Sequence, residues 1–260
     1  MVGSESRAYE PSDAEVVRSV LRAATSLTAV ANGSRHELLG SDIAVVERTE
    51  ERAEERAELR LRVPLDSRLA REAAMVAGEG GGLPVALEWT DVAPLAVRQR
   101  IRARVRIAGM LSSRGRTEPE GMLSLPVDVR HVALATPGAD GLVDPAELLR
   151  AEPDPLAVVE AALLLHLAED HQGHVAALLG LIDPQLLYGV TEVSPLALDR
   201  YGIVLRLSRE WPGGRRHAHP PHQDVRLSFG EPLPDADQVG RRLHALLAGH
   251  GEQRPAVRRD

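Results

Sequence analysis

The stretch Val97–Ile107 reads VRQRIRARVRI and has the clearest periodicity in the 260-residue chain. Its odd-numbered positions are apolar or small, apart from Gln99, and every even-numbered position is an arginine. A period of two is the period of a β-strand, whose successive side chains point to opposite faces. We therefore predict a strand with one face on a core and five guanidinium groups on the other. The five are Arg98, Arg100, Arg102, Arg104 and Arg106.

Several shorter strands are predicted around this one, so the first part of the chain is mostly β. Alternation, turn residues and β-branched content indicate strands at Ser26–Ala31, within His36–Glu47, at Leu59–Val63, at Leu83–Thr90 and within Met122–Thr136. Turns are expected at Asn32-Gly33 and Asp140-Gly141. Short helices should begin after Pro11, at Asp66 or Ser67, and at Asp144-Pro145. The charge run at residues 47–58 is interpreted as a solvated loop or hairpin tip.

A proline-rich joint at residues 152–155 separates a second region with a different pattern. A helix should run from Pro155 to about Ile182, with a bend near Gly173. A hairpin turning at residues 199–202, a third strand and a last helix opened by Pro234-Asp235 follow. The prediction is an α+β protein with two domains, residues 1–150 and 151–260, the second built as helix, three-stranded antiparallel sheet and helix.

The composition excludes several kinds of chemistry. All 31 cations are arginine, lysine and cysteine are absent, and 38 acidic residues give a net charge of −7. Without lysine there is no Schiff base and no P-loop lysine, and without cysteine there is no thiolate nucleophile, disulfide or iron–sulfur cluster. The negative charge and scarce aromatics argue against nucleic-acid binding. We see no signal peptide and no apolar run long enough to span a membrane, and expect a cytoplasmic protein.

Three segments of the second region resemble a known family. The segment 166–171 (HLAEDH), the turn 199–202 (DRYG) and the segment 226–233 (RLSFGEPL) are similar to the small C-terminal domain of HugZ/ChuZ-type haem-utilisation proteins. The resemblance implies that an FMN-binding-type split β-barrel, related to pyridoxamine 5′-phosphate oxidase, precedes that domain. It also implies a homodimer.

The resemblance suggests haem as the cofactor, with a role in haem utilisation or degradation. Such members hold the iron through a histidine in the C-terminal tail, and His250 matches that position best. If the protein is an enzyme, a haem oxygenase-like oxidoreductase is implied. A flavin-dependent oxidoreductase is less favoured, because arginine alone would have to grip the FMN phosphate. A non-enzymatic, protein-binding role, as in the plant relative that binds glutamyl-tRNA reductase, is a further alternative.

The candidate site residues each have a structural alternative. Arg100, Arg102 and Arg104 suit haem propionates or another small anionic ligand, or else form ion pairs with acidic neighbours such as Glu47, Glu58 or Glu88. His166, Asp170, His171 and His174 share a helix and belong to a haem or metal site, or to a hydrogen-bonded network. The His-rich loop at residues 215–222 is a ligand-contacting lid or a solvated loop. No catalytic triad or glycine-rich phosphate loop is indicated.

Overall fold

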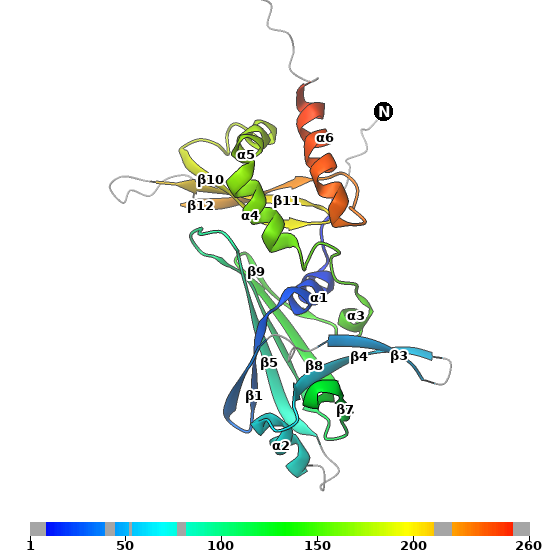
Figure 1. Cartoon of the computed structure of the whole chain (residues 1–260). Helices are drawn as coiled ribbons and strands as arrows, with labels where there is room; N and C mark the ends of the chain where they lie inside the picture. The colour runs from blue at the N-terminus through cyan, green and yellow to red at the C-terminus, as the bar shows by residue number, and fades with distance from the viewer. Residues whose placement is uncertain (1–8, 40–44, 52–53, 77–81, 211–219, 252–260) are drawn as a thin grey trace, which may run out of the picture. The chain divides into compact units, whose positions relative to one another are not determined.

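A computed structural model describes residues 9–39, 45–51, 54–76, 82–210 and 220–251. Its contacts divide the chain into two compact units. The sheet unit comprises residues 11–92 and 101–154. The C-terminal unit comprises residues 1–10, 93–100 and 155–260, so a short segment between two strands of the sheet unit belongs to it. Figure 1 labels the elements of both units, and each unit is considered by itself.

Within the described residues the sheet unit contains one nine-stranded antiparallel sheet in the order β2-β1-β5-β6-β8-β4-β3, with β7 and β9 also paired to β8. The strands are β1 (Ser26–Ala31), β2 (Ser34–Leu39), β3 (Val45–Glu51), β4 (Glu54–Pro64), β5 (Leu83–Val92), β6 (Ile101–Leu111), β7 (Arg116–Glu118), β8 (Met122–Thr136) and β9 (Ala139–Val143). The long strand β8 pairs with β4 through its first half and with β6 and β9 through its second half.

Short helices accompany this sheet, and the three α-helices among them have side-chain N-caps. The short helices are α1 (Asp13–Ala23), α2 (Arg68–Met75), η3 (Pro119–Gly121) and α3 (Pro145–Arg150). Ser12 and Glu15 form a reciprocal capping box on α1, Ser67 caps α2, and Asp144 caps α3. These side chains satisfy backbone N–H groups that the first helical turn leaves unpaired. The three helix starts predicted for this part of the chain are confirmed.

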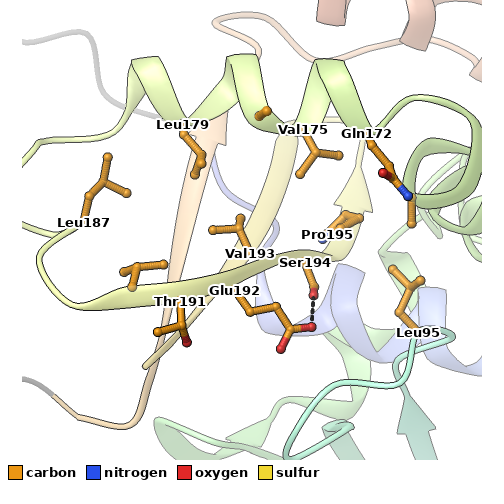
Figure 2. Close-up of a pocket in the computed structure, with 13 residues that line it drawn as sticks. Leu95, Gln172, Val175, Leu179, Leu187, Thr191, Glu192, Val193, Ser194 and Pro195 are labelled. Atoms are coloured by element: carbon orange, nitrogen blue, oxygen red, sulfur yellow. Dashed lines mark hydrogen bonds between the residues drawn. The ribbon is translucent and has the colours of Figure 1, made fainter. Parts of the chain in front are cut away.

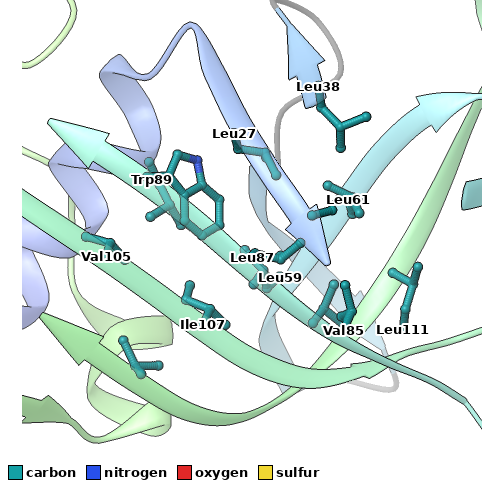
Figure 3. Packing of buried hydrophobic residues seen from close by; sticks show 14 of the residues in the cluster. Leu27, Leu38, Leu59, Leu61, Val85, Leu87, Trp89, Val105, Ile107 and Leu111 are labelled. Atoms are coloured by element: carbon teal, nitrogen blue, oxygen red, sulfur yellow. The ribbon is translucent and has the colours of Figure 1, made fainter. Parts of the chain in front are cut away.

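One hydrophobic core fills the sheet unit, and β6 supplies its centre (Figure 3). Ala103, Val105 and Ile107 are at most 4% exposed, whereas Arg104 and Arg106 on the opposite face are exposed. The alternation predicted for this strand is therefore confirmed from Ala103 to Ile107. The core side chains drawn around it include Leu27, Leu59, Leu61, Leu87 and Trp89.

The prediction that the strand begins at Val97 is wrong, because β6 begins at Ile101. Residues 93–100 form a loop in which Gln99 has a positive φ of 54°. The buried guanidinium of Arg206 donates to the carbonyl oxygens of Arg98 and Gln99 at 2.5 and 2.7 Å, which holds the loop out of strand geometry. Two of the five predicted arginines therefore leave the strand face.

Other predicted boundaries have mixed outcomes. The strands at Ser26–Ala31 and Met122–Thr136 are confirmed, as is the turn at Asn32-Gly33, where both residues have positive φ. The charge run at residues 47–58, predicted as a solvated loop or hairpin tip, instead supplies paired strand residues, 47–51 of β3 and 54–58 of β4. The turn predicted at Asp140-Gly141 is wrong, since both residues belong to β9 and the chain reverses at residues 137–138.

The C-terminal unit contains an antiparallel sheet, β10-β11-β12, and several helices. The elements are α4 (Glu160–Asp170), α5 (Gln172–Leu178), η4 (Leu179–Leu181), β10 (Val190–Asp199), β11 (Gly202–Arg209), β12 (His222–Ser228), η5 (Ala236–Gln238) and α6 (Val239–Gly251). The whole described chain is thus α+β, with a large antiparallel sheet, a smaller three-stranded one and helices. The helix predicted to start at Pro155 begins only at Glu160, because residues 155–159 form a turn. The predicted bend near Gly173 is instead a break at His171, which separates α4 from α5.

Charged side chains fix the turns of the smaller sheet. Asp199 accepts hydrogen bonds from the N–H groups of Tyr201 and Gly202, and a bidentate pair from Arg226 at 2.8 and 2.6 Å. The predicted turn at residues 199–202 is confirmed. In the described part of the chain, none of the helices combines the length and apolar character needed to cross a lipid bilayer.

Replacement of Arg206 should destabilise the C-terminal unit. Its side chain is 1% exposed and forms a bidentate pair with Asp224 at 2.7 Å, besides the two loop carbonyls. Arg206→Met would leave these acceptors without their donor and should lower the free energy of unfolding by about 3 kcal/mol in urea denaturation. Arg130→Met is the control, because Arg130 and Asp128 are both more than 60% exposed. Arg130→Met should lower the free energy of unfolding by less than about 1 kcal/mol.

Glu118 should make stability depend on acid pH. Burial alone would raise the pKa of this carboxyl, but hydrogen bonds from Arg116, Arg62 and Ser124 and the charge of Arg62 together lower it. A carboxyl whose pKa is lower in the folded state than in the unfolded state stabilises the fold at any pH above its unfolded-state pKa. That stabilisation is lost as the pH falls through the folded-state pKa. The stability difference between wild type and Glu118→Gln should therefore shrink as pH falls below about 4.5. A difference independent of pH would contradict the linkage.

Candidate functional site

Two adjacent rows of side chains cross the sheet unit on the face opposite its core. Strand register aligns Glu88, Arg106, Ala133 and Leu142 in one row and Thr90, Arg104, Ala135 and Asp140 in the next. The alanines of β8 lie between the two arginines of β6 on one side and Asp140 and the 81% exposed Leu142 of β9 on the other. Small side chains between larger ones leave a shallow groove of about 690 Å³. This surface is called the sheet-face groove.

The arginines predicted for a ligand site have different surroundings. Arg102 forms a bidentate pair with Asp91 at 2.9 and 2.8 Å. Arg100 donates to the carbonyl oxygens of Ala93 and Pro94 in its own loop. These two guanidinium groups therefore have structural contacts within the protein.

Arg104 and Arg106 line the sheet-face groove. Arg106 lies 3.6 Å from Glu88, a predicted acidic neighbour that also approaches Arg35 at 3.8 Å. Within the described residues, the Arg104 side chain has no hydrogen-bond or ion-pair partner. Arg104 is thus the arginine of the predicted set that the groove leaves available to an anion.

Of the remaining predicted acidic neighbours, Glu58 does not line this groove. Glu58 pairs with Arg60 at 2.6 Å in β4. The side chain of Glu47 lies outside the described residues.

A β-bulge brings His131 to the same face as the groove. The β6–β8 register passes from Ala108↔His131 to Gly109↔Val129, so Arg130 is an extra residue in β8. The extra residue shifts the alternation, and His131 falls in phase with Ala133 and Ala135 rather than with the core residues. A Cβ on Gly109 would lie 2.2 Å from the Asp128 carbonyl oxygen, so the close approach of the strands requires glycine there.

Sequence reasoning did not identify His131. The alternation of Leu125 and Val127, continued without a bulge, places residue 131 on the core side. The signal that was present is Gly109, since glycine inside a strand often marks a bulge or a close approach.

The histidines predicted as a site in the C-terminal unit, His166, His171 and His174, lie next to one another. His166 Nδ1 lies 2.7 Å from Asp170 Oδ2, and His166 Nε2 lies 3.1 Å from His171 Nε2. His174 and His244 continue the row, with ring centroids about 5 Å apart from one ring to the next. Among the described residues, no group of three or more histidine and acidic side chains is arranged to hold a metal ion.

Two predicted sites depend on residues whose side chains are not described. His250 lies in the last turn of α6, and its side chain is outside the described residues. Residues 211–219, which include most of the predicted His-rich loop, also lie outside them, whereas His222 begins β12.

A second groove, of about 520 Å³, lies in the C-terminal unit between α5 and β10 (Figure 2). Leu95, Val175, Leu179, Leu187 and Val193 supply its apolar wall. Among the described residues that line it, Glu192 is charged and none is an arginine or a histidine. Negative charge disfavours an anionic ligand here, so the sheet-face groove is the better candidate for the predicted anion site.

Comparisons with known proteins support the fold. No protein-family model matches the sequence, and no curated protein sequence is significantly similar to it. A solved structure described as a haem-binding protein from Mycobacterium smegmatis is similar, with a TM-score of 0.57 and 17% sequence identity. The match covers 94% of this chain and 100% of that chain. Identity this low establishes a shared fold and no more.

Substitution should distinguish Arg104, which has no partner among the described residues, from Arg102, which is paired with Asp91. Arg104→Gln removes an exposed side chain without a partner in the described structure, so the free energy of unfolding should change by less than about 0.5 kcal/mol. Arg102→Gln breaks a bidentate pair with Asp91, so it should cost about 1–2 kcal/mol. Urea denaturation of both variants measures the contrast, and equal losses would contradict the assignment of Arg104 as free.

Proposed function

We propose that this protein binds haem at the sheet-face groove. The observation that carries the proposal is Arg104, an exposed guanidinium without a partner in the described residues, beside a floor of Ala133 and Ala135. Haem is a flat apolar macrocycle with two carboxylates at one edge. A flat floor of small side chains suits the ring, and an arginine fork suits a propionate.

The charges around the groove favour one edge for the propionates. Glu88 is shared by Arg35 and Arg106, so their positive charge is partly neutralised. Asp140 lines the same groove and would repel a carboxylate placed beside it. Arg104 therefore is the anchor that we assign to a propionate.

Two histidines are candidates for the iron ligand. His250 is the position that the family resemblance implies. His131 is exposed and two residues from Ala133, about 7 Å along β8, on the groove face. A neutral imidazole in either place would bind iron through a ring nitrogen. Bound haem would supply the oxygen chemistry, and the residues of this chain would orient it.

The wider proposal follows the resemblance and the solved structure with a shared fold. That structure is described as haem-binding, which supports haem as the ligand here. We propose a split β-barrel for the sheet unit, a homodimer, and a role in haem utilisation or degradation. The exposed apolar Leu142 beside the groove supports a face that is covered in the assembled protein.

A flavin is the second candidate, since Arg104 would equally suit the phosphate of FMN. The groove then holds a planar ring system and one phosphate in place of a macrocycle and two carboxylates. Titrations with hemin and with FMN distinguish the two, and failure of both would favour the non-enzymatic, protein-binding alternative.

Hemin titration followed by the Soret band tests the proposal. Wild-type protein should give a saturable red shift, and Arg104→Ala should weaken hemin binding about tenfold, because one charge-assisted contact is lost. Arg71→Ala, which removes an exposed arginine on α2 outside the groove, should bind like wild type. His131→Ala and His250→Ala identify the iron ligand, because the true ligand's loss should change the Soret maximum.

Different failures have different meanings. Absence of a saturable Soret shift in wild type would overturn haem binding itself. A wild-type shift that Arg104→Ala leaves unchanged would keep haem but remove the sheet-face groove as its site.

A further inference from the structure

We propose that the C-terminal unit carries a separate transition-metal site, in which His166 and His171 bind one divalent late first-row ion through their Nε2 atoms. Both residues are described, and both belong to the same unit. The proposal stands independently of haem binding, because no residue of the sheet-face groove takes part in it.

The distances between the two rings fit a shared metal ion. Their Nε2 atoms are 3.1 Å apart, their centroids are 4.7 Å apart and the ring planes are at 88°. If both Nε2 atoms lay about 2.05 Å from one metal ion, an N–metal–N angle of about 95° would reproduce the Nε2–Nε2 distance and the centroid–centroid distance. This angle describes adjacent positions of a square-planar or octahedral ion, and it lies below the tetrahedral value preferred by zinc. The same angle prevents the two from serving as opposite axial ligands of one haem.

Asp170 prepares His166 for this role. Its carboxylate accepts a hydrogen bond from Nδ1 at 2.7 Å, so the Nδ1 proton is fixed and the lone pair is left on Nε2. In the metal-free protein this lone pair accepts a hydrogen bond from His171 Nε2–H at 3.1 Å, so metal binding requires His171 to move its proton from Nε2 to Nδ1. A carboxylate behind a ligating histidine orients the ring and raises its basicity in metal sites.

The break between α4 and α5 creates the pair. In a continuous helix, residues five apart would be about 140° apart around the axis and their side chains would diverge. His171 has φ −128° and ψ 37°, which ends α4 and turns the imidazole toward His166. The His166 side chain is 59% exposed, so water or another ligand can complete the coordination.

The geometry selects the class of ion. Square-planar or tetragonal nitrogen sites favour Cu²⁺ and Ni²⁺, and Cu²⁺ stands highest in the affinity order of the divalent first-row ions. The ring of His174 lies 5.0 Å from that of His171, centroid to centroid. No third donor among the described residues joins the pair, so the site is open.

Cu²⁺ titration of the full chain by calorimetry, with electron paramagnetic resonance of the bound ion, tests the site. Wild type should bind one Cu²⁺ most tightly, with hyperfine splitting from two nitrogens. His166→Ala and His171→Ala should each weaken that binding at least tenfold and leave one nitrogen of the pair. Asp170→Asn keeps the side-chain shape and should weaken it about tenfold.

His131→Ala is the matched control, since it removes an exposed histidine of the other unit and should leave the tight Cu²⁺ site unchanged. Unchanged circular dichroism would show that the variants still fold. If neither His166→Ala nor His171→Ala alters tight Cu²⁺ binding, the proposal is wrong. That result would leave haem binding at the sheet-face groove untouched, because neither His166 nor His171 lines that groove.

Discussion

The central strand β6 can bury one of its two faces, and this constraint organises the sheet unit. Burial of Arg104 or Arg106 without a partner would cost several kcal/mol, whereas Val105 and Ile107 gain by leaving water. The strand therefore has one orientation, with its apolar side in the core. Because a one-residue slip would exchange the two faces, the pairing of β6 with β5 and β8 is strongly specified. The rows of the sheet-face groove follow directly from that register.

The bulge at Arg130 is the second determinant of this face. It reverses the phase of β8 halfway along its length, so that one strand serves the core through Leu125 and Val127 before it and through Val132 and Leu134 after it. The local cost is a strict requirement for glycine at residue 109, where the Asp128 carbonyl leaves no space for a side chain. The gain is an imidazole on a face that also has an available guanidinium. Bulges commonly redirect side chains in this way beside functional sites.

Local chemistry explains which parts of the fold could be predicted from sequence. The turn at Asn32-Gly33 and the cap at Asp144 were predictable because each depends on residues adjacent in sequence. The start of β6 was not, since Arg206, more than a hundred residues later, holds the carbonyls of residues 98 and 99. The meeting of His166 and His171 likewise depends on a helix break, which the helical spacing of the segment does not reveal.

The arginine-only composition makes a count of cations a poor guide to function in this chain. Arg206 and Arg226 form bidentate pairs with aspartates, and Arg60 and Arg209 donate to serine and carbonyl oxygens in the interior. In most proteins some of these contacts would fall to lysine, and an arginine cluster would point more directly to anion recognition. In this chain, structural and ligand-binding arginines must be distinguished by the partners of each guanidinium.

A guanidinium that is already paired with a carboxylate would have to break that ion pair before it could bind a ligand. The exposed Arg104, without such a pair in the described residues, can bind a carboxylate or phosphate at no such cost. The functional assignment therefore rests on this one side chain rather than on the five-arginine pattern in which it occurs.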